Sequence, residues 1–167
     1  MQAGIAIEDR LKKRLAELFD RYGRETTELA YLLTGDRDLA QDVSQEAFVR
    51  LFGRFAHLRN PEATRSYLRR TVVNQVRSHF RRRRTERRYL EAQPPPLAVE
   101  EPALAEGNET LALFHSLPTN QRAAVLLRFY FDLSEQQTAQ ILDVTPKAVN
   151  GLVRRGLNSL RGMSDDE

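Results

Sequence analysis

Four prolines within the eighteen residues 91–108 prevent any regular helix from crossing the middle of this 167-residue chain. The segment, EAQPPPLAVEEPALAEGN, has no sustained apolar period, and its prolines favour extended backbone. The residues on either side are therefore expected to bury their apolar side chains separately, in two small units. We predict units at 8–90 and 109–162, joined by a flexible linker at 91–108.

Helical periodicity is strong in both units, and strand signals are weak, with no run of alternating β-branched residues and no Asn-Gly or Asp-Gly turn. The helices predicted in the first unit lie at about 8–30, 37–52 and 61–88. Three or four further helices are expected in the second unit. The predicted fold class is all-α, with two small helical domains.

Composition excludes several classes of function. The chain has no Cys and three widely separated His, so it offers neither disulfides nor the ligand spacing of a metal site. It has no Gly-rich cofactor loop and no carboxylate cluster of a nuclease, so we expect no catalysis, no cofactor and no metal. Apolar runs stay well below the roughly 18 residues of a membrane span, and the N-terminus lacks a secretion signal. We therefore expect a cytoplasmic protein without membrane insertion.

Charge is distributed unevenly along the chain. Residues 61–90 contain ten Arg against two Glu, whereas residues 91–120 contain five Glu and no Lys or Arg. This asymmetry suggests a polyanionic partner for the first unit and an acidic connector behind it.

The helix predicted at 61–88 is apolar on one side and cationic on the other. At about 100° per residue, the apolar stripe consists of Leu68, Val72, Val76 and Phe80. The opposite side carries Arg70, Asn74, Arg77, Arg81, Arg84 and Arg88. Like charges at i, i+4 repel, and a phosphate backbone would reverse that penalty. We therefore predict nucleic-acid contact, with an amide at position 74 that can read a base edge. The alternatives are an ordinary solvated face and an Asn74 that only bonds a nearby loop.

The segment DLSEQQTAQILDVTPKAVNGLVRRGLNSLR is typical of a helix-turn-helix. Ser134 and Gln137 form a capping box for a helix at 135–142, and Asp143 can adopt the left-handed conformation of a tight turn. Thr145 then caps the second helix. The outward residues of that helix, expected to enter a major groove, are Lys147, Asn150, Gly151, Arg154, Arg155, Asn158 and Arg161. A helical hairpin used only for packing is the alternative, but it would not need this cationic side.

The order of these features, over about residues 15–161, resembles the extracytoplasmic-function (ECF) sigma factors of the sigma-70 family. In them a helical bundle, region 2, is joined by a flexible linker to a helix-turn-helix domain, region 4. The resemblance implies promoter-specific transcription initiation by a protein that binds core RNA polymerase and the −10 and −35 elements of promoter DNA. On the polymerase, the β′ coiled coil and the β flap would be contacted. It also implies an anti-sigma factor as regulator. An autonomous helix-turn-helix regulator is the alternative, although it would usually need a dimerisation helix and none is seen after Arg161.

Each unit carries part of the resemblance. GDRDLAQDVSQEAFVRLF resembles the segment that binds polymerase. The interface that this implies consists of Asp42, Gln45, Glu46 and Phe48, with Asp38 added because it continues an acidic ridge spaced by four. YLRRTVVNQVRSHFRRRR resembles the −10 recognition and melting helix, in which Asn74 would contact an unstacked base. The −10 residues are then Arg70, Asn74, Arg77, Arg81 and Arg84, and residues 56–64 match the variable base-pocket loop.

The C-terminal segment resembles region 4, which reads the −35 element. The −35 residues implied are Lys147, Asn150, Gly151, Arg154, Arg155 and Asn158. Three departures leave the −35 preference open: Ser78 stands where many members carry Asp, Asp143 replaces the usual turn Gly, and Asn150-Gly151 replaces a basic and a small polar residue.

Overall fold

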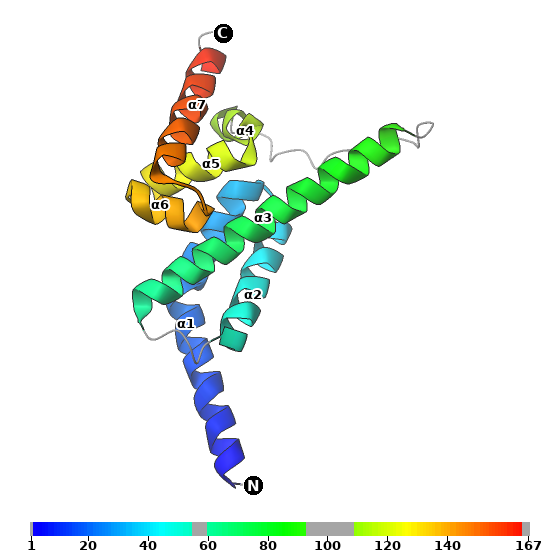
Figure 1. Cartoon of the computed structure of the whole chain (residues 1–167). Helices are drawn as coiled ribbons and strands as arrows, with labels where there is room; N and C mark the ends of the chain where they lie inside the picture. The colour runs from blue at the N-terminus through cyan, green and yellow to red at the C-terminus, as the bar shows by residue number, and fades with distance from the viewer. Residues whose placement is uncertain (1, 55–59, 93–108, 165–167) are drawn as a thin grey trace.

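The computed structural model describes residues 2–54, 60–92 and 109–164, and every regular element within these ranges is a helix. Two long helices fold back on each other, α1 (Gln2–Thr34) and α2 (Arg37–Arg54), and both contact a third, α3 (Pro61–Glu91), as Figure 1 shows. The shorter elements that follow are α4 (Glu109–Ser116), α5 (Thr119–Val125), the π-helical turn η2 (Leu126–Tyr130), α6 (Glu135–Leu142) and α7 (Pro146–Ser164). The predicted all-α class is confirmed.

The three helices expected in the first unit correspond to α1, α2 and α3. α2 and α3 are two and three residues longer than predicted, and α1 is ten residues longer. From residue 93 on, the predicted linker lies outside the described residues. So do residues 56–59 of the predicted base-pocket loop, whereas residues 61–64 of that loop form the first turn of α3. The bounds of the two domains therefore stay predictions.

Local capping signals set the turns between the long helices. α1 is followed by Gly35, whose φ of 72° is left-handed and whose N–H donates to the Tyr31 carbonyl at 2.7 Å. The Asp36 carboxylate accepts from the first turn of α2. Asn60 caps α3 by accepting from the Ala63 N–H at 2.6 Å. These turns bring α1, α2 and α3 together around shared apolar faces.

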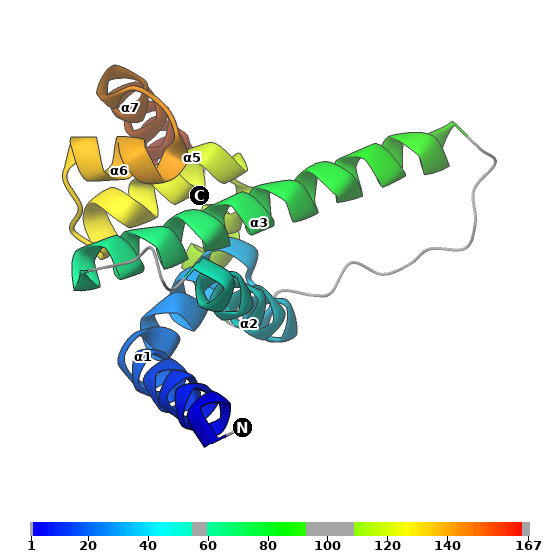
Figure 2. The same cartoon turned by 60° about the horizontal axis from the view of Figure 1, so that its bottom comes forward.

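A single apolar core runs through both groups of helices. Leu29 of α1, Leu51 of α2 and Val72 of α3 are fully buried, and Leu127 and Leu142 of the C-terminal helices belong to the same cluster. Figure 2 shows α5 and α6 lying along the N-terminal half of α3. The two units thus pack directly against each other, so the prediction that they bury their apolar side chains separately is wrong.

Candidate nucleic-acid and polymerase interfaces

The surroundings of α3 change at Phe80. The stripe predicted to face the core is buried or half-buried: Leu68, Val72, Val76 and Phe80. Beyond it, every residue from 81 to 90 is exposed, and α3 projects from the body of the molecule (Figure 1). Arg81 and Arg84 lie on this projecting part and make no ion pair with any residue in the described ranges.

Nearer its N-terminus, the same side of α3 is partly covered by the C-terminal helices. The Arg77 Nε donates to Asn120 Oδ1 at 2.8 Å, and its Nη1 donates to the Leu142 carbonyl at 3.0 Å. The Arg70 Nη2 lies 3.5 Å from Asp143 Oδ1. Of the −10 residues predicted on this part of α3, Arg70 and Arg77 are therefore engaged within the chain.

The prediction that this whole side faces away from the core is wrong for Arg77, which is half-buried. Burial lowers the pKa of its guanidinium, the Asp143 carboxylate raises it, and Arg81 lowers it. The physical reason is that α3 has a second contact surface, on which α6 packs. Thr71 and Val73, on the flank of the basic side, are also buried. Asn74 remains exposed.

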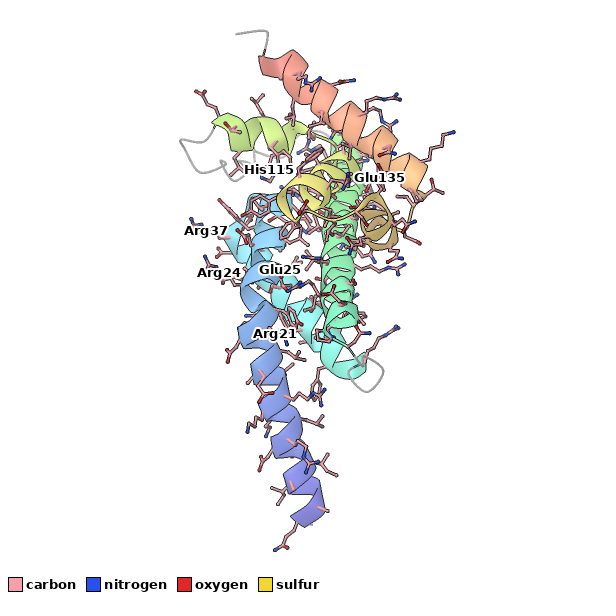
Figure 3. All side chains as sticks on the ribbon, turned by 90° about the vertical axis from the view of Figure 1, so that its left-hand side faces the viewer. Arg21, Arg24, Glu25, Arg37, His115 and Glu135 are labelled. Carbon is pink, nitrogen blue, oxygen red and sulfur yellow. The ribbon has the colours of Figure 1, made fainter. Side chains whose placement is uncertain are left out.

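Two other arginines of α3 act within the fold. Glu25 of α1 points to α3 (Figure 3), and its carboxylate pairs with Arg69 and, at 3.4 Å, with the Arg65 Nε. The Arg69 side chain is mostly buried. These two guanidiniums hold α1 to α3, and neither belongs to the predicted DNA face.

The helix-turn-helix geometry follows its local signals. The Ser134 hydroxyl accepts from the Gln137 N–H at 3.1 Å, and the Gln137 side chain accepts from the Ser134 N–H at 2.9 Å, which completes the capping box. Asp143 has φ 55° and ψ 49°, the left-handed conformation that the bend needs. Thr145 caps α7 by accepting from the Ala148 N–H at 3.1 Å.

The outward side of α7 forms an open groove. Its lining includes five of the predicted residues, Lys147, Asn150, Gly151, Arg154 and Arg155. Asn158 is exposed further along α7, and the Asn150 Nδ2 donates to Glu135 Oε2 at 3.1 Å. Val149 at the centre of the opposite side is fully buried, so the helix is firmly seated while its basic side stays accessible.

On α2 the predicted acidic ridge lies at the surface. Asp38, Asp42 and Glu46 are exposed, with Gln45 exposed beside them. Glu46 pairs with Arg50 one turn later, at 2.9 Å. Such a ridge suits a basic partner.

Phe48, the apolar member of the predicted polymerase interface, is only 5% exposed. Its ring packs against Phe19 of α1 with centroids 5.1 Å apart. The apolar side chains that this part of the surface does expose are Phe19, Val49 and Phe52. Phe48 therefore supports this surface from beneath, and its exposed neighbours were missed because periodicity alone does not say how far α1 covers α2.

Arg122 is a buried residue that the sequence analysis also missed. It is 5% exposed, and its guanidinium donates to the carbonyls of Leu33, His115 and Leu117 while lying over the Phe80 ring at 5.6 Å. Burial lowers its pKa to about 10, so it stays charged at neutral pH. The one available signal was a lone charge at the start of the apolar run RAAVLL.

Acidification is expected to destabilise the fold through His115. Burial and then the Arg122 charge lower the pKa of His115 from 6.5 to about 4. The unfolded chain binds this proton more readily, so the stability that His115 contributes is complete above pH 6.5 and is lost as the pH falls toward 4. Because the ring is only half-buried, we expect a loss of about 1–2 kcal/mol.

Urea unfolding at roughly pH 7.5 and pH 4.5 measures this effect. His115→Gln should reduce the difference in unfolding free energy between the two pH values. An unchanged difference would show that other groups cause the pH dependence.

The described residues include neither a membrane-spanning helix nor a metal-binding cluster. No helix among them is both long and apolar enough to cross a membrane. No group of three or more His, Asp or Glu in these ranges could hold a metal ion.

Both groups of helices match the sequence models of known protein domains. Residues 18–86 match the family model for sigma-70 region 2, and residues 108–160 match that for sigma-70 region 4. The RNA polymerase sigma-E factor of Streptomyces avermitilis is 30% identical over 124 residues, which cover 73% of this chain and 69% of that protein. The chain belongs to the ECF sigma factors of the sigma-70 family. It is also 23% identical to the ECF RNA polymerase sigma factor SigX of Bacillus subtilis over 155 residues, 86% of this chain and 80% of the relative.

The fold agrees with this membership. The structure superposes on the sigma factor RpoE of Bartonella quintana, solved in complex with the anti-sigma factor NepR, with a TM-score of 0.71 at 17% identity, covering 92% of this chain and 98% of that one. This ECF sigma factor thus has a region 2 domain built from α1–α3 and a region 4 domain built from the C-terminal helices. It directs promoter-specific transcription initiation by binding core RNA polymerase and the −10 and −35 elements.

Proposed function

We propose that α3 recognises the −10 element in this sigma factor, acting through Arg70, Asn74, Arg77, Arg81 and Arg84. The observation that carries this assignment is the projecting part of α3, where the exposed guanidiniums of Arg81 and Arg84 make no ion pair with an acidic residue in the described ranges. Phosphates would neutralise them, and Asn74 is exposed and carries one donor and one acceptor for a base edge.

In this proposal α7 recognises the −35 element, and it acts through Lys147, Asn150, Gly151, Arg154, Arg155 and Asn158. Its groove is open, and the N-terminal end of a recognition helix is the part that enters a major groove. The acidic ridge of α2 would bind a basic surface of core polymerase, with Phe48 shaping it from below. All three assignments describe binding without catalysis, in a cytoplasmic protein.

The regulator in this proposal is a separate anti-sigma factor. A structural relative was solved with such a partner. The exposed Phe19, Val49 and Phe52 give region 2 an apolar surface next to the acidic ridge. A protein that covers this surface would block polymerase binding.

Run-off transcription with core polymerase on a promoter library tests the proposal. Arg154→Ala/Arg155→Ala should weaken binding of the holoenzyme to −35 duplex by about 30-fold or more, because each of the two guanidinium contacts with a base or phosphate contributes about 1–3 kcal/mol. The slope of log affinity against log salt should fall by about 1–2.

The matched control is Arg10→Ala/Lys13→Ala, which removes the same charge from exposed positions on the free part of α1. It should leave both quantities nearly unchanged. If the two double variants behave alike, α7 is not the reader and only net charge matters.

A further inference from the structure

The amide of Asn150 on α7 is hydrogen-bonded to Glu135 on the preceding helix, α6. The two residues are 15 positions apart in the chain, and the Asn150 Nδ2 donates to Glu135 Oε2 at 3.1 Å. We propose that Glu135 fixes the orientation of this amide, and that the oriented amide selects adenine in the −35 element. The inference rests on the proposed function of α7. It adds to that site a positioning residue and the base that is selected.

The chemistry of a carboxylate determines which atom of the amide it faces. An ionised carboxylate only accepts hydrogen bonds, whereas an amide has one donating and one accepting end. The Nδ2 end of Asn150 therefore faces Glu135, because the flipped amide would bring Oδ1 against the carboxylate. Asn150 is thus held in one of its two orientations, with Oδ1 available as an acceptor.

Both partners of this hydrogen bond stand on well-fixed backbone. Glu135 lies beside α7 (Figure 3), and it is half-buried between the two capping-box residues Ser134 and Gln137. On α7, Val149 is fully buried next to Asn150. Holding the amide in place therefore costs little conformational entropy, and the amide is oriented before DNA arrives.

The Glu135 carboxylate is placed where it would otherwise oppose DNA binding, because a carboxylate beside a DNA-binding surface repels phosphate. It makes no ion pair with any residue in the described ranges, although Lys147 and Arg154 line the groove of α7 with Asn150. Neutralising a basic side chain is therefore not its role. A carboxylate in the first turn of α6 also interacts favourably with the helix dipole. That second contribution would be similar from the neighbouring exposed position, Gln136.

Asn150 supplies an acceptor to a groove whose other side chains are mainly donors. The remaining polar residues that line the groove are Thr145, Lys147, Arg154 and Arg155. Lysine and arginine only donate, so they match phosphates and the N7 and O6 acceptors of guanine. The Thr145 hydroxyl already accepts from the Ala148 N–H at 3.1 Å. Among these lining residues, the acceptor for a base amine is therefore Oδ1 of Asn150.

The fixed amide matches adenine better than the other bases. Oδ1 can accept from the N6 amine, and the Nδ2 proton that Glu135 does not use can donate to N7, which is the two-bond contact of asparagine with adenine in a major groove. Guanine and thymine would place the acceptors O6 and O4 near Oδ1. Cytosine offers an amine without the N7 acceptor, so it can form only one of the two bonds.

Gly151 leaves room beside the amide for a cation. A Cβ at position 151 would lie 3.3 Å from Arg155 Nη1 and 3.8 Å from Arg155 Nη2, so the Arg155 guanidinium lies against the backbone of α7 at this glycine. A side chain at position 151 would compete with the guanidinium for the same space. The pair Asn150-Gly151 therefore places one fixed acceptor next to one flexible donor group.

Holoenzyme binding to upstream duplexes tests the base that is selected. The parent sigma factor, assembled with core polymerase, first selects from duplexes with a randomised −35 element. The position at which Asn150→Ala loses its base preference is the one that Asn150 contacts. There the parent should prefer adenine over guanine by about 10-fold to 100-fold, and Asn150→Ala by less than about threefold. A parent that prefers another base at this position, or an Asn150→Ala variant that keeps every preference, would overturn the proposal.

Two base analogues separate the two hydrogen bonds. Purine lacks the N6 amine of adenine, and 7-deazaadenine lacks N7. Each analogue should weaken binding of the parent by about threefold to tenfold more than it weakens binding of Asn150→Ala. Equal losses in the two proteins would show that the amide does not contact this base.

Glu135→Gln tests the positioning residue. A glutamine amide can pair with either end of Asn150, so the preference for adenine over guanine should fall by about threefold to fivefold. Glu135→Gln/Gln136→Glu keeps the net charge and the first-turn carboxylate of α6 but moves the carboxylate away from Asn150, and it should show the same loss. The matched control, Gln136→Glu alone, should keep the preference of the parent. If Glu135→Gln keeps that preference, or if the swapped variant restores it, Glu135 does not orient the amide.

The proposed function of α7 fails separately. Arg154→Ala/Arg155→Ala should weaken binding whatever base stands opposite Asn150. If this variant binds like the parent and the selection yields no −35 preference, α7 does not bind DNA and both proposals are overturned. If it weakens binding while Asn150→Ala keeps every base preference, α7 binds the −35 element and only the selection of adenine is overturned.

Discussion

Replacing Arg122 by alanine is expected to lower the free energy of unfolding by about 3–5 kcal/mol. The side chain is almost fully buried and donates to three carbonyl groups, those of Leu33, His115 and Leu117. Alanine would leave these acceptors without their donor and would leave a space beside Phe80. Urea unfolding followed by circular dichroism at neutral pH measures the loss.

Two controls separate burial from charge. Arg122→Lys keeps the charge, but a single ammonium group cannot reach the three carbonyls that the planar guanidinium reaches. This variant should therefore lose about half as much stability as the alanine variant. Arg21→Ala removes a more exposed guanidinium that lies over the Tyr22 ring at 5.5 Å, and should cost about 1 kcal/mol or less. A loss below about 1 kcal/mol for Arg122→Ala would show that water replaces the guanidinium at these carbonyls.

Asn74→Ala is expected to reduce the rate of promoter opening by about 10-fold to 100-fold, with core polymerase binding unchanged. The amide is exposed on α3 between Arg70 and Arg77, and a base-edge contact of this kind contributes about 1–3 kcal/mol. Alanine also favours helix more than asparagine does, so the change should not loosen α3. Opening is measured by the fluorescence of a base analogue in the −10 element, and polymerase binding by co-purification.

Ser78→Ala is the matched control, since Ser78 is exposed one turn further along the same helix. It should open promoters at close to the parent rate. If Asn74→Ala also opens at the parent rate, the arginines alone engage the −10 strand. If it instead weakens polymerase binding, the role assigned to Asn74 is wrong.

Local features of this fold could be predicted because their causes lie within a few residues. The capping box of Ser134 and Gln137, the left-handed Asp143 and the cap at Thr145 were all predicted from neighbouring side chains, and all are present. The buried stripe of α3 was likewise predicted from its spacing, because a helix repeats its faces regularly.

Features that depend on distant residues could not be predicted. The periodicity of α3 shows one apolar stripe, but the burial of Arg77 requires knowing that α6 packs beside it. Phe48 was expected at a partner surface, and only the position of Phe19 shows that it is covered. The burial of Arg122 could not be predicted from its neighbours in sequence, because its three carbonyl partners lie in α1 and at the end of α4.

The projecting end of α3 has a consequence for how nucleic acid is held. Residues 81–91 extend the helix by about 16 Å beyond Phe80. Arg81, Arg82, Arg83 and Arg84 are consecutive, so at about 100° per residue their side chains point to nearly all sides of this rod. Its positive field is close to cylindrical, and a phosphate backbone can approach it from any direction with similar affinity. Under the proposed function, alignment of the promoter would then come from elsewhere, from the single amide at position 74 and from α7.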